Sequence, residues 1–131
     1  ASPARVLAAM DPANPFGQVL PWPQHETARP SRSVGAVVVI AGGHCLAYLG
    51  RGGRSLALFP SDSPDLTATQ VFHALAECVA QTRMPRFRIE EIDGVRATAH
   101  PAAATLREAG AGLHPQGLVV EGASGPGRGV R

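Results

Sequence analysis

Two arginines flank a pair of glycines in the stretch LGRGGRSL, residues 49–56. If Gly52 and Gly53 form the tip of a tight hairpin, Arg51 and Arg54 face each other across it. Like charges directly opposite on a β-ladder repel each other, unless an anion lies between them. Paired guanidinium groups suit phosphate oxygens, and glycine lets a ligand approach the backbone closely. The turn is therefore predicted to contact phosphates. A solvated loop tip, where water and salt screen the repulsion, is the alternative.

Two residues of the preceding segment extend this prediction. Arg32 is expected to add a further phosphate contact. Trp22 stands between Pro21 and Pro23, where its ring either stacks on a nucleobase or anchors the proline-rich segment to the core. An anchor is the more usual role of a lone tryptophan in such a segment, and both interpretations stay open.

The absence of lysine excludes two kinds of enzyme site. All twelve basic residues are arginine, and with ten acidic residues the formal net charge is +2. The P-loop of nucleotide hydrolases requires the pattern GxxxxGK[ST], and a Schiff base requires a lysine amine. We therefore expect neither a P-loop ATPase site nor a lysine Schiff base in this chain.

No other group of residues has the spacing of a catalytic or metal site. His73 and Glu77 lie one helical turn apart, but no third ligand accompanies them, so no metal site is predicted. Asp11 and Asn14, in the run DPANP, precede prolines and are expected to cap turns. No catalytic residue is assigned from the residues alone.

The composition is that of one folded domain. The chain has 131 residues, of which 44% are hydrophobic and 17% charged, enough for a buried core. No apolar run approaches the ~20 residues that cross a bilayer, so no membrane partner is expected. Cys45 and Cys78 lie in apolar patterns and are predicted to be buried free thiols. A cytoplasmic location is predicted from these features.

Residues 34–59 are expected to form three antiparallel strands joined by two Gly-Gly turns. Paired glycines supply the positive φ that type I′ turns require. The resulting registers set Leu49 opposite Leu56 and Val38 opposite Ala47. Both faces of this sheet are then apolar, so it should be covered on both sides. A small curled or barrel-like sheet with a helix packed outside satisfies that requirement.

Residues 63–83 show the clearest helical pattern, with Ser63 at the N-cap, Pro64 at the first position and an apolar stripe. A second hairpin is predicted over residues 86–99, and a short helix from residue 101 to a stop at residue 110. The fold class is therefore α+β: a small curled or barrel-like antiparallel sheet, one long packed helix and a short C-terminal helix.

The second hairpin is expected to turn at Asp93 and Gly94, which pairs Glu91 with Arg96. A last short strand is expected at GLVVE, residues 117–121.

Three segments are expected along the chain. Residues 1–33, whose ARVLAAM run looks like the end of a helix, form a proline-rich connector from an upstream domain. Residues 34–121 form the barrel-like α+β domain. Residues 122–131 form a disordered, glycine-rich tail.

Three runs of the sequence resemble the end of a known protein family. They are DPANPFGQVLPWP, GAVVVIAGGHCLAYLGRGGRSLALFP and IEEIDGVRATAHPAAATLREAGAGLHPQGLVV. Together they are similar to the C-terminal region of the large helicase-related (Lhr) family of bacterial ATP-dependent DNA helicases. The resemblance spans residues 5–121. In that family, a helicase core with two RecA-like domains and a winged helix precedes further winged-helix modules and a barrel-like module.

The resemblance implies an accessory, DNA-associated C-terminal domain of a helicase that acts in DNA repair. ATP and Mg would belong to the helicase core of the parent protein and not to this chain. The implied partners are DNA, with single strands or an RNA–DNA hybrid included, and the upstream winged-helix and helicase domains. A homo-oligomer is left open.

Two other functions compete with this interpretation. The region also resembles, more weakly, the winged-helix-plus-barrel DNA glycosylases of the alkylpurine and crosslink-repair type, whose catalytic glutamine motif lies outside the matching part. A glycosylase would use Asp11, or an acid near the second hairpin, to activate water. The third interpretation is a structural barrel that mediates assembly through its apolar faces.

Overall fold

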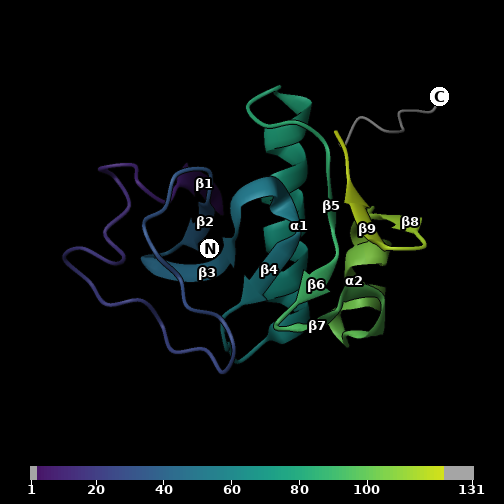
Figure 1. Ribbon diagram of the computed structural model, residues 1–131, viewed down its shortest axis with the longest axis horizontal. Coiled ribbons are helices and arrows are strands. Elements are labelled where there is room, and N and C mark those ends of the chain that lie inside the picture. The colour runs from purple at the N-terminus through teal and green to yellow at the C-terminus, as the bar shows by residue number, and fades with distance from the viewer. Residues whose placement is uncertain (1–2, 123–131) are drawn as a thin grey trace.

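The computed structural model of the chain describes residues 3–122 and contains two sheets and two α-helices (Figure 1). The strands are β1 (Arg5–Ala8), β2 (Val37–Ala41), β3 (His44–Leu49), β4 (Ser55–Leu58), β5 (Phe87–Ile89), β6 (Glu91–Ile92), β7 (Val95–Arg96), β8 (Gly112–His114) and β9 (Gly117–Val120). The larger sheet has the order β1-β2-β3-β4-β6-β7 and the smaller sheet the order β5-β9-β8. Both are antiparallel except at β4 and β6. The predicted α+β class is confirmed; the larger sheet is curled and does not close into a barrel.

The meander β2-β3-β4 follows the predicted turns with one correction. Leu49 lies opposite Leu56 as expected. Val38, however, lies opposite Tyr48 and not Ala47, because the register shifts by one residue between Val39 and Ile40. A β-bulge of this kind moves the side chains beyond it to the other face of the sheet.

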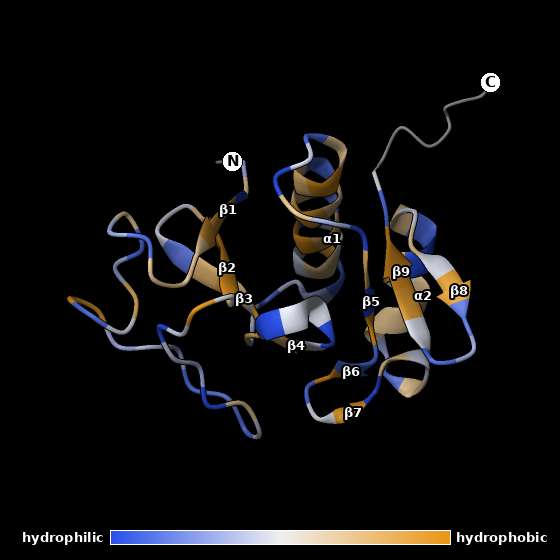
Figure 2. Cartoon of the chain, turned by 45° about the horizontal axis from the view of Figure 1, so that its top comes forward, coloured by the Kyte–Doolittle hydropathy of each residue, from blue (hydrophilic) through white to orange (hydrophobic). Residues whose placement is uncertain are grey.

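Both faces of this meander are covered, as its two apolar faces require. On one face Val39 joins Ala47 and Leu49 in the main core, beneath helix α1 (Pro64–Ala80). On the other face Val38 and Cys45 join a second cluster that the proline-rich segment covers. Figure 2 shows β2 and β9 as mainly hydrophobic strands, in keeping with their buried positions.

The Gly52-Gly53 turn is longer than the predicted two-residue hairpin. Residues Arg51–Gly53 form a 3₁₀ turn, in which the Gly53 N–H donates to the Gly50 carbonyl at 3.0 Å. The Gly50 N–H in turn donates to the Ser55 carbonyl at 3.0 Å. Both central glycines have positive φ, +86° and +77°, which explains why glycine occupies both positions.

Helix α1 packs between the two sheets and against the second helix, α2 (Ala102–Ala109) (Figure 1). Pro64 occupies its first position, as predicted, and the expected apolar stripe is buried. The helix ends at Ala80, three residues before the end of the predicted helical pattern at residue 83. Helix α2 stops at Gly110, whose φ of +130° suits glycine alone.

The second hairpin is confirmed in its turn and register but is shorter than predicted. Asp93 and Gly94 both have positive φ, and Glu91 pairs with Arg96. Only β6 and β7 belong to it, because β5 pairs instead with the distant strand β9. The predicted strand at residues 117–121 is confirmed as β9, and β8 is a strand that the sequence analysis missed.

The first 33 residues take part in the fold. Residues 5–8, interpreted as the end of a helix, are instead the edge strand β1 and pair with β2. Val6 is buried within this strand. Pairing with a sheet has here overridden the local preference of the residues. Asn14 and Phe16, within the proline-rich segment, are buried. The domain boundary at residue 33 stays a prediction.

The predicted tail, residues 122–131, lies outside the described residues except for Gly122. Within residues 3–122, none of the helices combines the length and the apolar character that a bilayer crossing requires. Cys45 and Cys78 are buried and free, as predicted.

The two central glycines of the turn allow a matched test of packing. A Cβ on Gly53 would lie 2.6 Å from Phe87 Cδ2, whereas a Cβ on Gly52 meets nothing within 4 Å. Gly52→Ala should cost only the left-handed backbone strain, about 1–2 kcal/mol. Gly53→Ala should cost a further ~1–3 kcal/mol from overpacking. Urea unfolding followed by circular dichroism measures both losses, and equal losses would contradict the packing of Phe87 under the turn.

Candidate functional site

The turn that carries Arg51 and Arg54 is fixed to the rest of the domain at Arg54. The Arg54 carbonyl accepts the N–H groups of Glu90 at 2.8 Å and Glu91 at 3.0 Å. The stem of Arg51 packs over Gly35, where a Cβ would come within 2.8 Å of Arg51 Cγ. The two arginines therefore have different neighbours, and phosphate contact at this turn stays a prediction.

A groove of about 340 Å³ opens beside this turn. Arg54 lines it together with Arg86, Arg88 and His114. Arg88 forms a salt bridge with Glu90 at 3.0 Å, whereas the side chains of Arg51 and Arg54 make no hydrogen bond or salt bridge to any residue from 3 to 122. The groove is therefore mainly basic; Arg54 lines it, whereas Arg51 does not.

Arg32 organises the proline-rich segment. Its guanidinium group donates to four backbone carbonyls of one loop, those of Asn14 (2.7 Å), Phe16 (3.0 Å), Asp11 (3.1 Å) and Met10 (3.4 Å). Because these bonds use both terminal nitrogens, the geometry favours a structural role for Arg32. These hydrogen bonds do not test whether Arg32 also contacts a phosphate, so that contact stays a prediction.

Trp22 packs in the second core cluster. Its ring lies 6.4 Å from that of Phe16 in a stacked arrangement and 5.6 Å from that of Tyr48, edge to face. Gly17 also lies against the indole, where a Cβ would come within 2.5 Å of Nε1. These contacts favour the anchor interpretation over base stacking.

Asp11 and Asn14 act within their own loop. The Asp11 carboxylate accepts the Ala13 N–H at 2.8 Å, which is the turn-capping bond expected of an aspartate. Asn14 is fully buried; its amide donates to the Ala9 carbonyl and accepts the Phe16 N–H. Both residues hold the DPANP turn.

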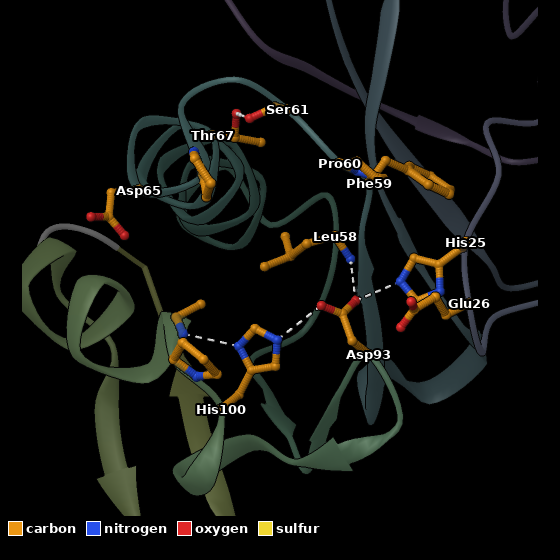
Figure 3. A pocket seen from close by; sticks show the side chains of 13 residues that line it. His25, Glu26, Leu58, Phe59, Pro60, Ser61, Asp65, Thr67, Asp93 and His100 are labelled. Carbon is orange, nitrogen blue, oxygen red and sulfur yellow. Dashed lines mark hydrogen bonds and ion pairs between the residues drawn. The ribbon is translucent and has the colours of Figure 1, made fainter.

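A second polar site, around Asp93, was missed by the sequence analysis. His25 Nε2 lies 2.7 Å from Asp93 Oδ1, and His100 Nε2 lies 2.9 Å from Oδ2 (Figure 3). The Leu58 N–H also donates to Oδ1, at 2.9 Å. One carboxylate thus accepts three hydrogen bonds from three segments of the chain.

The backbone fixes the tautomers of both histidines. The Ala28 N–H donates to His25 Nδ1 at 3.0 Å, and the Ala102 N–H donates to His100 Nδ1 at 2.9 Å. A neutral imidazole that accepts at Nδ1 carries its proton at Nε2. Both rings therefore donate to Asp93, and the arrangement is satisfied with neutral histidines.

This cluster lines a pocket of about 480 Å³ between β4, the start of α1 and the start of α2. Figure 3 shows Glu26 and Asp93 on one side of the pocket and Asp65 on the other. Leu58, Phe59 and Pro60 supply apolar wall. Three carboxylates make this pocket acidic, in contrast to the groove beside the turn.

Neither cysteine is poised as a nucleophile. Burial raises the pKa of the Cys45 thiol to about 12, and burial also raises the pKa of Cys78. Both thiols are protonated near neutral pH, and a thiol attacks as the thiolate. Among residues 3–122, no group of three His, Cys, Asp or Glu side chains is placed to hold a metal ion.

No protein-family model matches the chain, but two curated proteins are similar to it. Over 113 residues it is 41% identical to the "Lhr helicase/uracil glycosylase" of Escherichia coli (strain K12), covering 86% of this chain and 7% of that protein. Over 93 residues it is 44% identical to the "Lhr helicase/ probable uracil glycosylase" of Mycolicibacterium smegmatis, covering 70% of this chain and 6% of that protein. The chain is related to the Lhr helicases.

The resemblance to the Lhr family is thereby confirmed, and it is consistent with a C-terminal region of these proteins. The chain spans less than a tenth of the length of either Lhr relative. The activities in the names of the relatives therefore belong to proteins that are many times longer.

Some local signals pointed to the Asp93 site. The Asp-Gly turn predicted Asp93 at the tip of a hairpin, and a proline follows His100. Because His25 precedes Asp93 by 68 positions, no spacing pattern connects the two residues. Only the path of the proline-rich segment over β4 brings them together.

The Asp93 cluster should contribute strongly to stability. Asp93→Asn keeps a residue that tolerates the φ of +54°, but it places an amide N–H₂ against a histidine N–H. Because hydrogen bonds to charged groups contribute about 1.5–3 kcal/mol, we expect the free energy of unfolding to fall by about 2–3 kcal/mol. Urea denaturation measures it. Asp62→Asn, at an exposed carboxylate in the same region, is the control. An equal loss of unfolding free energy in both variants would contradict a stabilising role for the hydrogen bonds of Asp93.

Proposed function

We propose that this chain is a nucleic-acid-associated accessory domain of an Lhr-type ATP-dependent DNA helicase that acts in DNA repair. The single observation that carries the proposal is the basic edge formed by Arg51, Arg54 and the adjoining groove, in a chain related to Lhr helicases. Phosphate contacts of this kind supply affinity without reading sequence.

The position of the turn supports phosphate contact. Arg51 and Arg54 are exposed. Gly52, between them, leaves room for a strand to approach, whereas Gly53 packs against Phe87. The rigid attachment of Arg54 to the β5–β6 junction holds the turn in place. A preorganised turn loses less entropy when it binds a strand.

In this proposal, the ATP and Mg site lies elsewhere in the complete protein. Upstream RecA-like and winged-helix domains would couple ATP hydrolysis to movement on DNA, while this domain holds the strand. A single strand and an RNA–DNA hybrid are both admissible ligands, because phosphates are common to both. We place the complete protein in the cytoplasm, where bacterial DNA is repaired. Self-association stays a prediction.

Removal of both turn arginines should weaken binding to DNA of any sequence. Arg51→Ala combined with Arg54→Ala should lower the slope of log K against log salt concentration by about 1.5 to 2, one contact for each arginine. Fluorescence anisotropy with two unrelated oligonucleotides, over a series of salt concentrations, measures the slope.

The matched control is the double variant Arg96→Ala and Arg107→Ala, which removes the same charge from exposed positions outside the groove. We expect the control to leave the slope within about half a unit of the original. If both double variants change the slope equally, net charge alone explains binding, and the turn has no special role.

A second candidate function is a part in base excision. Both relatives carry uracil glycosylase in their names, and the Asp93 pocket offers a carboxylate within a concave, partly apolar wall. An aspartate of this kind could activate water for attack on a glycosidic bond. However, Asp93 already accepts three hydrogen bonds, so its oxygens have little remaining capacity to accept a proton from water.

Excision would produce abasic sites in a uracil-containing duplex. If Asp93 is the base, Asp93→Asn in a full-length Lhr protein carrying this chain should lower the rate by about 10²-fold or more. Asp11→Asn tests the other acid suggested by the sequence. Alkaline cleavage of the labelled duplex measures the product. Unchanged rates in both variants, with folding verified by circular dichroism, would exclude these acids as the base.

A further inference from the structure

Three histidines of this chain share one local arrangement. In each, Nδ1 accepts a hydrogen bond from the backbone N–H of the residue two positions later in the sequence. The donors are Thr27 for His25 (3.2 Å), Ala102 for His100 (2.9 Å) and Gln116 for His114 (3.0 Å). Each neutral ring therefore carries its proton at Nε2, where it requires an acceptor.

The acceptor is present for two of the three rings. His25 and His100 both donate to the carboxylate of Asp93. His114 Nε2 instead lies 3.4 Å from Nη1 of Arg88. A guanidinium nitrogen can only donate. Since a neutral imidazole accepts at one nitrogen only, and the Gln116 N–H occupies Nδ1, two donors face each other in the groove.

Arg88 is held in this position from behind. Its Nε and Nη2 both donate to Glu90 Oε2, at 3.2 and 3.0 Å. The guanidinium group is therefore fixed with Nη1 turned toward His114, and it does not need to reorganise to receive a ligand. Arg88 lines the groove together with Arg54 and Arg86.

The other arginines of the groove are available. Arg86 forms only a loose salt bridge of 3.6 Å to Glu121, with side chains that are 68% and 56% exposed, and such a pair contributes little. Arg54 forms no salt bridge or hydrogen bond through its side chain within the described chain. Among the residues that line the groove, three arginines face one carboxylate, that of Glu90, which already binds Arg88.

We propose that this groove is an oxyanion site for a phosphate group, with one phosphate oxygen between Arg88 Nη1 and His114 Nε2. Arg54 and Arg86 bind the remaining oxygens from the two edges of the groove. A tetrahedral phosphate accepts hydrogen bonds from several directions, which matches donors that come from the turn, from β5 and from β8. Arg88 Nη1 and His114 Nε2, two donors that face each other in the free chain, would then share a phosphate oxygen as their acceptor.

The identity of the phosphate rests on the proposed function, since a nucleic-acid strand would supply it. Both an internal phosphodiester and a terminal phosphate have this chemistry. The site extends the contact surface from Arg51 and Arg54 to β5 and β8, and it would hold the strand along the junction of the two sheets.

Inorganic phosphate is the direct probe of the site. We expect amide signals of Gly52, Phe87–Glu90 and His114–Gln116 to shift saturably in ¹H–¹⁵N NMR spectra as phosphate is added, with sodium chloride at matched ionic strength as reference. His114→Asn keeps an acceptor for the Gln116 N–H but removes Nε2, and it should weaken phosphate binding about tenfold. Arg54→Ala should weaken it similarly.

Arg51→Ala is the control, because Arg51 does not line the groove; phosphate should bind this variant as it binds the original chain. The absence of saturable shifts, or phosphate affinity unchanged by His114→Asn in a chain whose spectrum remains folded, would overturn the oxyanion site. These results do not depend on any nucleic acid.

A tetranucleotide with or without a 5′-phosphate separates the sources. A higher affinity for the phosphorylated strand, lost in His114→Asn, would support a terminal phosphate. Equal affinities, both lowered by His114→Asn, would support an internal phosphodiester. If inorganic phosphate binds at this site and neither strand does, the oxyanion site stands and the proposed DNA role fails. If strands bind through Arg51 and Arg54 but phosphate does not shift the groove, the DNA role stands and this inference fails.

Discussion

The carboxylate of Asp93 joins three segments that are far apart in the sequence. It accepts hydrogen bonds from His25 of the proline-rich segment, from the Leu58 N–H at the end of β4 and from His100 just before α2. Local backbone bonds to Nδ1 hold both imidazole rings in the donating tautomer. Because each donor depends on this one carboxylate, the position of the segment over the sheet and the start of α2 are set together.

The same local geometry of histidine serves two different sites. Where a carboxylate faces Nε2, as at His25 and His100, the result is a closed structural clamp. Where a guanidinium group faces it, as at His114, the result is a site that lacks an acceptor. The acidic pocket and the basic groove lie in different parts of the molecule. The two cavities therefore differ in charge, because carboxylates line the pocket and arginines line the groove.

Local chemistry predicted much of the fold. The Gly42-Gly43 turn, the proline at the start of α1 and the Asp-Gly hairpin each follow from backbone preferences of single residues, and all three are present. The failures share one cause. The bulge after Val39, the edge strand formed by residues 5–8 and the pairing of β5 with β9 depend on partners that lie elsewhere in the chain. No local pattern encodes such partners.

The sequence by itself determined the fold class, the absence of a P-loop lysine, the placement of the two arginines around a flexible pair of glycines and the likeness to Lhr helicases. Tertiary structure alone decided that Arg32 binds carbonyls, that Arg54 shares a groove with Arg86, Arg88 and His114, and that Asp93 holds two histidines. The physical reason is that a side chain is free, paired or buried according to the donors and acceptors within about 3 Å of it. Those neighbours come from residues dozens of positions away.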